Sequence, residues 1–129
     1  MSSPALTLPA WDTPLPEALE RGWIHGETRK FGGESIASVN PATGETWGGF
    51  DDGGEPAVDA AVASARSAFL GEWGRIGGDE RAALLLAWAA RIAEAVEQLA
   101  WLETLEVGRP IAAARALIAQ GPLLIGYYA

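Results

Sequence analysis

The sequence contains no cysteine, and this absence excludes three kinds of chemistry. A chain without thiols has no disulfide framework, no thiolate metal site and no thiol nucleophile. Histidine is almost as scarce, since His25 is the single one. A lone histidine without clustered carboxylates is more typical of a surface or packing residue than of a general base or a metal ligand. The sequence therefore provides little of what nucleophilic or metal-dependent catalysis needs.

Positive charge is also in short supply. The 129 residues include 9 Lys+Arg against 17 Asp+Glu, so the formal net charge is -8 and the sequence pI is about 4.5. Surfaces that bind nucleic acid or anionic lipid need clustered Lys and Arg to neutralise phosphate. The composition thus argues against both kinds of partner. With 49% hydrophobic residues, the chain is nevertheless expected to fold around a modest core.

No apolar run is long enough to cross a membrane. The most apolar run, Ala82–Ala90, contains Trp88 and stops at Arg91, whereas a spanning helix needs about 20 residues. The first residues lack the basic region and the apolar core of a signal peptide. We therefore expect a cytoplasmic protein without membrane association.

The first part of the chain predicts an arm and then strands. Residues 1–21 contain four spaced prolines, which favour an extended N-terminal arm over a continuous helix. Residues 22–50 predict a small β-hairpin or meander with a first turn at Gly26–Glu27. The expected strands are Trp23–His25, Ser35–Val39 and Thr46–Phe50.

A turn with a clear physical basis joins the last two predicted strands. In Asn40–Glu45, Pro41 presets φ for the first turn position and Gly44 tolerates positive φ at the exit. The Asp51–Asp52 pair that follows the strand is interpreted as turn and helix N-terminal charge, not as a catalytic pair.

Residues 55–129 predict three helices. An apolar stripe at spacings of three and four indicates a first helix that begins near Pro56 and ends at Gly71 (Val58, Ala61, Val62, Ala65 and Phe69). The second is expected from an Asp79 N-cap to Val107, with Gly108 as C-cap, and its length allows a kink near residues 96–98. The third is expected to open at Pro110 and to be interrupted at Gly121–Pro122.

No glycine-rich loop has the spacing that holds a phosphate, because the glycine doublets lie in predicted turns and not between a buried parallel strand and a helix. The six tryptophans are scattered, which favours core and interface packing over a dedicated binding surface. The apolar, aromatic end of the chain, residues 123–129, predicts a chain truncated inside a domain.

Six short stretches form an ordered set of motifs. They are Trp23–Glu27 (WIHGE), Val39–Glu45 (VNPATGE), Val58–Phe69 (VDAAV and AR.AF), Glu80–Leu86 (ER..LLL), Leu102–Pro110 (LETLEVGRP) and Tyr127–Ala129 (YYA). In this order and spacing they resemble motifs of the NAD(P)+-dependent aldehyde dehydrogenase superfamily. The arm before Gly22 has no counterpart among them.

The resemblance implies an α+β fragment, namely the truncated N-terminal portion of an aldehyde dehydrogenase over residues 22–129, within the Rossmann-like cofactor-binding domain. The family's catalytic Cys, Glu and Asn and its nicotinamide site come later in its chains, so no catalytic or cofactor-binding residue is expected here. The complete enzyme would use NAD or NADP to oxidise an aldehyde to an acid. This chain alone would be inactive scaffold, with the remainder of the enzyme as its partner in a homo-oligomer.

The resemblance also implies one metal site. In several relatives, the carbonyl at the position of Val39 and the acid at the position of Glu106 share Na+ or K+, and hard cations prefer such oxygen ligands. The alternative is that Glu106 is merely a solvated residue in the last turn of a helix. For the whole chain, the alternative is a stand-alone helical interaction module or a decayed remnant of such an enzyme.

Overall fold

Two hairpins precede five helices in the computed structural model, which describes residues 22–129. The predicted arm, residues 1–21, lies outside the described residues. The order of strands and then helices confirms the predicted α+β fold. The elements are β1 (Gly22–Ile24), β2 (Glu27–Arg29), β3 (Ser35–Val39), β4 (Thr46–Asp51), α1 (Gly54–Leu70), α2 (Glu72–Arg75), α3 (Gly78–Glu94), α4 (Val96–Val107) and α5 (Ile111–Tyr128).

The first hairpin turns one residue earlier than predicted. Strands β1 and β2 are antiparallel, and Ile24 pairs with Glu27, so the turn consists of His25 and Gly26. Both residues have positive φ, 58° and 77°, which is the conformation that a two-residue turn needs to match the twist of its strands. His25 is therefore a turn residue and does not belong to the strand.

The second hairpin follows the prediction closely. Strand β3 has the expected bounds, β4 extends one residue further, to Asp51, and the two pair antiparallel in a sheet separate from β1–β2. The Asn40–Glu45 turn is confirmed, because the Gly44 N–H donates to the Asn40 carbonyl at 2.8 Å and Gly44 has a φ of 75°. The two hairpins thus do not form one meander.

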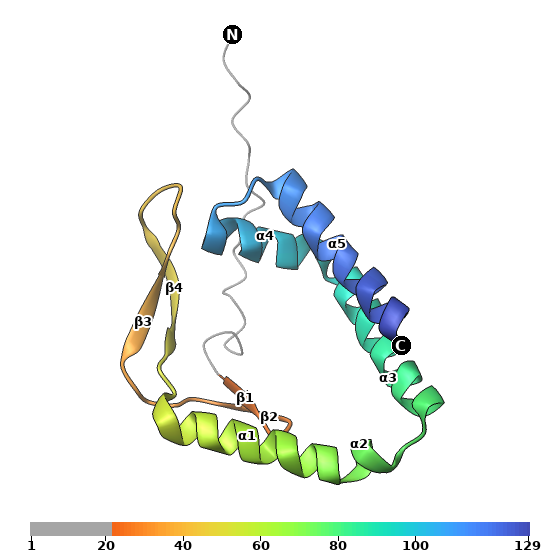
Figure 1. The fold of residues 1–129 in the computed structure, drawn as a ribbon. Coiled ribbons are helices and arrows are strands. Elements are labelled where there is room, and N and C mark those ends of the chain that lie inside the picture. The colour runs from red at the N-terminus through yellow and green to blue at the C-terminus, as the bar shows by residue number, and fades with distance from the viewer. Residues whose placement is uncertain (1–21) are drawn as a thin grey trace.

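The predicted second helix is divided in two at Ala95. There φ is -98° and ψ is 9°, so the chain leaves α3 and starts α4 in a new direction (Figure 1). The N-cap of α3 is Gly77 and not Asp79, and the Gly77 N–H donates to the Glu80 carboxylate at 3.1 Å. That bond satisfies one of the free amides at the helix start.

Helix α5 runs through Pro122 without a break, which corrects the predicted interruption at Gly121–Pro122. Proline removes one backbone hydrogen bond, but α5 packs along both α3 and α4. A Cβ on Gly126 would lie 3.8 Å from the Leu86 side chain of α3, so the part after the proline is held by tertiary contact. Among residues 22–129, no helix is long and apolar enough to span a membrane.

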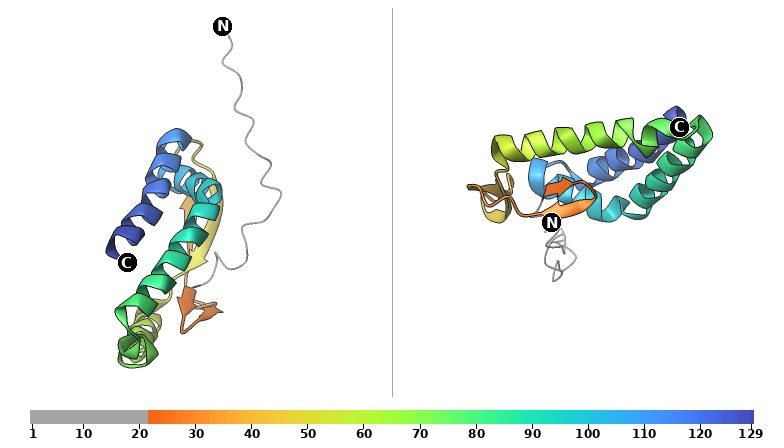
Figure 2. Two further views of the ribbon diagram at one scale, coloured as in Figure 1. Left: turned by 90° about the vertical axis from the view of Figure 1, so that its right-hand side faces the viewer. Right: turned by 90° about the horizontal axis from the view of Figure 1, so that it is seen from below.

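The core is small and lies where α3, α4 and α5 pack together. Its buried alanines are Ala89, Ala100 and Ala114, and the last two are fully inaccessible. Figure 2 shows α3 and α5 side by side and antiparallel, while Figure 1 shows α1 at a distance from them, joined through α2. The helices therefore form an open frame and do not close around a common core.

Candidate functional site

The two residues predicted as cation ligands lie on elements that touch. Val39 ends β3, Glu106 lies in the last turn of α4, and these two elements are in contact. Between them, the Ser38 hydroxyl donates a hydrogen bond to Oε2 of Glu106. Since Ser38 directly precedes Val39, the fold brings the Glu106 carboxylate to the end of β3 from 68 positions away in the sequence.

The C-terminal end of α4 rests on the turn that follows β3. Gly108 is the C-cap of α4, as predicted. It has a left-handed conformation, with a φ of 74°, and its N–H donates to the Thr104 carbonyl at 3.0 Å. A Cβ on Gly108 would come within 2.8 Å of the Pro41 ring. The carbonyls of a helix C-terminus carry partial negative charge, so the helix end and the Glu106 carboxylate together make this junction attractive to a cation.

The nearest basic side chain along the sequence does not neutralise Glu106. Arg109 instead forms an ion pair with Glu103, with 2.9 Å between Nε and Oε1. None of the ion pairs found within residues 22–129 involves Glu106. Carbonyl and carboxylate oxygens without a basic partner suit a hard monovalent cation, and the residues present therefore fit the Na+ or K+ that the resemblance implies.

The described part of the chain does not offer the side-chain ligands that other metal ions need. Over residues 22–129, no three His, Cys, Asp or Glu side chains gather closely enough to hold a metal ion. Zinc and calcium sites in proteins use such sets of side-chain ligands. Any cation at the β3–α4 junction would therefore have to be held mainly by backbone oxygens together with Glu106.

Sequence reasoning missed two residues near the junction. Ser38 is 7% exposed, whereas Ile36, which strand alternation places on the same face, is 43% exposed. The contact with α4, and not the alternation, therefore buries Ser38. Trp47 is the extra residue of a β-bulge, because Ser38 pairs with Gly48 and Val39 pairs with Thr46. The buried indole N–H of Trp47 finds no acceptor within the described residues, and no pattern in the sequence indicated the bulge or this unpaired donor.

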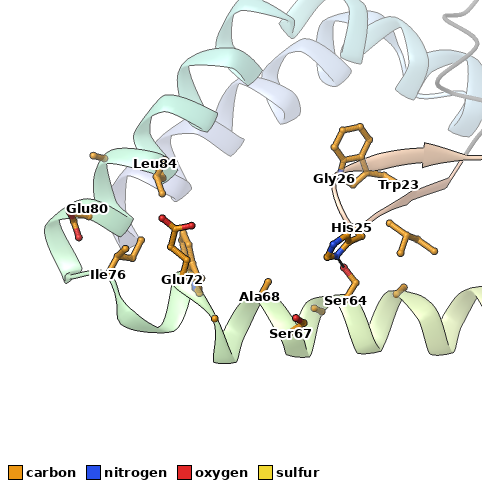
Figure 3. Close-up of a pocket in the computed structure, with 16 residues that line it drawn as sticks. Trp23, His25, Gly26, Ser64, Ser67, Ala68, Glu72, Ile76, Glu80 and Leu84 are labelled. Atoms are coloured by element: carbon orange, nitrogen blue, oxygen red, sulfur yellow. Dashed lines mark hydrogen bonds between the residues drawn. The ribbon is translucent and has the colours of Figure 1, made fainter.

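A separate hollow of about 960 Å³ lies between the β1–β2 hairpin, α1, α2 and the start of α3. Figure 3 shows Trp23 and His25 on one side of it and Leu84 on the other, with Glu72 directed inward from α2. The His25 Nδ1 and Ser64 Oγ atoms lie 3.4 Å apart and join the hairpin to α1. In the described part of the chain, no carboxylate bonds to that histidine, so the pair lacks the third group of a nucleophilic triad.

Comparison with known proteins gives the same family throughout. The family model described as "Aldehyde dehydrogenase family" matches residues 27–129. A yeast aldehyde dehydrogenase, the NAD(P)+ enzyme 2 of Saccharomyces cerevisiae, is 40% identical over 98 residues, which are 75% of this chain and 19% of the yeast protein. The 3-sulfolactaldehyde dehydrogenase of Pseudomonas putida is 35% identical over 107 residues, 83% of this chain and 21% of that enzyme.

Solved structures agree. An aldehyde dehydrogenase from Bacillus cereus superposes with a TM-score of 0.80 at 36% identity, covering 84% of this chain and 23% of that one. The NAD-dependent enzyme of Sinorhizobium meliloti gives 0.77 at 38% identity, covering 81% and 21%. The chain thus spans about a fifth of the length of the curated relatives it matches. With the match over residues 27–129 and the shared fold, the chain belongs to the aldehyde dehydrogenase family.

Proposed function

We propose that this chain is part of an enzyme that oxidises an aldehyde to a carboxylic acid with NAD+ or NADP+, and that residues 22–129 act as its scaffold. The family match over residues 27–129 carries the proposal. The bound nicotinamide would accept the hydride. The chain's own residues would build and hold the domain around that cofactor, since the sequence has no cysteine to act as nucleophile.

The scaffold role is supported by the amount of apolar surface on α1. The predicted stripe forms on this helix, but no α1 residue is buried, and Val62 and Phe69 are 62% and 66% exposed. Burial of each such side chain is worth about 1.5–3 kcal/mol. A stripe left open in this way is what a helix shows when its packing partner is another part of a larger protein.

Val39 and Glu106 would hold Na+ or K+ in the complete enzyme, through a backbone carbonyl and a carboxylate. The Ser38–Glu106 hydrogen bond supports this part of the proposal, because it places the carboxylate at the end of β3. The cation would brace the β3–β4 hairpin against α4. We further propose, from the family resemblance, that the complete enzyme is a cytoplasmic homo-oligomer.

A second function has one observation in its favour. The same exposed stripe on α1 would also suit a stand-alone helical module that binds a protein partner. The two functions differ in what covers the α1 stripe. In a dehydrogenase scaffold it is the remainder of the enzyme, and in a stand-alone module it is an unrelated protein.

A chimeric enzyme tests the proposed function. Residues 22–129 would replace the corresponding segment of the Bacillus cereus enzyme, which shares the fold at a TM-score of 0.80. The chimera should be folded and should form NAD(P)H when an aldehyde is added, because its catalytic residues come from the Bacillus part. A chimera with the segment deleted is the control and should be inactive. A chimera carrying residues 22–129 that is insoluble or inactive would argue for the stand-alone module.

A further inference from the structure

Ser38 is the one polar residue that is buried among those of residues 22–129 whose burial the structure describes, at 7% exposed. Its hydroxyl faces α4 and donates to Oε2 of Glu106. A buried hydroxyl is stabilised only when it has a partner. Here the partner is an ionised group, and hydrogen bonds to charged groups are the stronger ones.

Glu106 needs such a bond in order to hold one orientation. Its side chain is exposed, and a free glutamate samples many rotamers. It also lies in the last turn of α4, where the helix dipole repels a carboxylate. No basic residue among those described pairs with it, so the Ser38 hydroxyl is the group that fixes its direction.

The hydrogen bond from Ser38 occupies one carboxylate oxygen of Glu106, Oε2, and leaves Oε1 without a hydrogen bond among the described residues. The serine hydroxyl has a single proton, which Oε2 accepts. The hydrogen bonds described for residues 22–129 include none to Oε1 of Glu106. The β-bulge falls between Ser38 and Val39, and a bulge interrupts the regular ladder. The Glu106 carboxylate, with Oε1 unbonded in the described part of the chain, therefore lies beside Ser38, where the β3–β4 ladder is interrupted.

We propose that Ser38 is a positioning residue of the Val39–Glu106 cation site, whose hydroxyl holds one oxygen of Glu106 so that the other can bind Na+ or K+. This inference rests on the proposed function, since the cation itself belongs to that proposal. Groups that orient a metal ligand change metal affinity by about 10- to 100-fold when they are removed. Loss of the Ser38 hydroxyl should weaken cation binding by that order.

The experiment measures thermal unfolding of the chimeric enzyme at increasing KCl or NaCl, with choline chloride keeping the ionic strength constant. With Ser38→Ala, the cation concentration for half-maximal stabilisation should rise about tenfold or more. The matched control is Ser35→Ala, which makes the same change at an exposed position of the same strand and should leave that concentration unchanged. A purely structural role for Ser38 would lower the melting temperature equally with and without the cation.

A second variant guards against failure of the first to fold. Ser38→Cys keeps the shape of the side chain but has only a weak donor, so its half-maximal concentration should also rise. A value equal to that of the wild-type segment, in either folded variant, overturns the role of Ser38 and leaves the proposed enzyme untouched. If the wild-type segment shows no response to K+ or Na+ beyond that to choline, the cation site is absent and the inference falls with it.

Discussion

Gly108 lies directly against the ring of Pro41, so that a Cβ on this glycine would come within 2.8 Å of Pro41 Cγ. The contact joins the end of α4 to the turn that follows β3. It is also the place where two of the family-like motifs, VNPATGE and LETLEVGRP, meet in space. Two separate constraints therefore favour glycine at position 108. Its φ of 74° is one that residues with a side chain rarely adopt, and the Pro41 ring leaves no room for a Cβ.

The first prediction separates those two constraints. Gly108→Ala should destabilise the chimeric enzyme by more than the roughly 1–2 kcal/mol of left-handed backbone strain, because the added methyl also clashes with Pro41. Gly44→Ala is the matched control, since Gly44 has a φ of 75° with nothing within 4 Å of a Cβ. Urea unfolding measures both. If the two substitutions lower the free energy of unfolding equally, the contact between Gly108 and Pro41 does not contribute to stability.

The second prediction concerns the open stripe of α1. The isolated chain should bind a hydrophobic dye and self-associate, because Val62 and Phe69 are exposed. Val62→Lys should reduce dye binding by the isolated chain, yet destabilise the chimera, in which the same residue should be covered. Ala63→Lys is the control, because Ala63 is exposed and lies off the stripe. It should change neither dye binding by the isolated chain nor the stability of the chimera. A monomeric isolated chain that melts cooperatively and binds no dye would favour the stand-alone module.

The third prediction tests the small core. Ala114 is fully inaccessible on α5, and overpacking of such a site costs about 1–3 kcal/mol. Ala114→Leu should therefore lower the melting temperature of the chimera. Ala112→Leu puts the same side chain on an exposed position of the same helix and should have little effect. Equal melting temperatures for the two variants would mean that the α3–α4–α5 packing is looser than the structure shows.

The fourth prediction concerns catalysis by the chain alone. The purified 129-residue chain should form no NAD(P)H with a panel of aldehydes, because it has no cysteine to attack the carbonyl. Absorbance of the reduced nicotinamide is the measurement, with the Bacillus cereus enzyme as positive control. Turnover that persists in constant ratio to the chain through further purification would contradict the prediction.

Much of the local structure could be predicted from the sequence, because turns and helix ends depend on residues that are neighbours along the chain. The Asn40–Glu45 turn follows from the fixed φ of Pro41 and the freedom of Gly44, and α1 follows from a stripe at helical spacing. The left-handed end of α4 at Gly108 follows in the same way from the absence of a side chain. The resemblance to the family, which the match over residues 27–129 confirms, also followed from the order of the motifs along the chain.

Tertiary structure decided the features that depend on distant partners. Pro122 stays within α5 because packing against α3 and α4 compensates for one lost hydrogen bond. The division at Ala95 turns α4 so that Trp101 becomes buried, whereas the apolar stripe of α1 stays open. The bond from Ser38 to Glu106 spans 68 positions, and no local pattern encodes such a pair. Sequence by itself determined the β3–β4 hairpin, α1 and the end of α4, but not β2, α2 or the division between α3 and α4. The packing of the chain determined which side chains meet, because burial and long-range hydrogen bonds are properties of the whole fold.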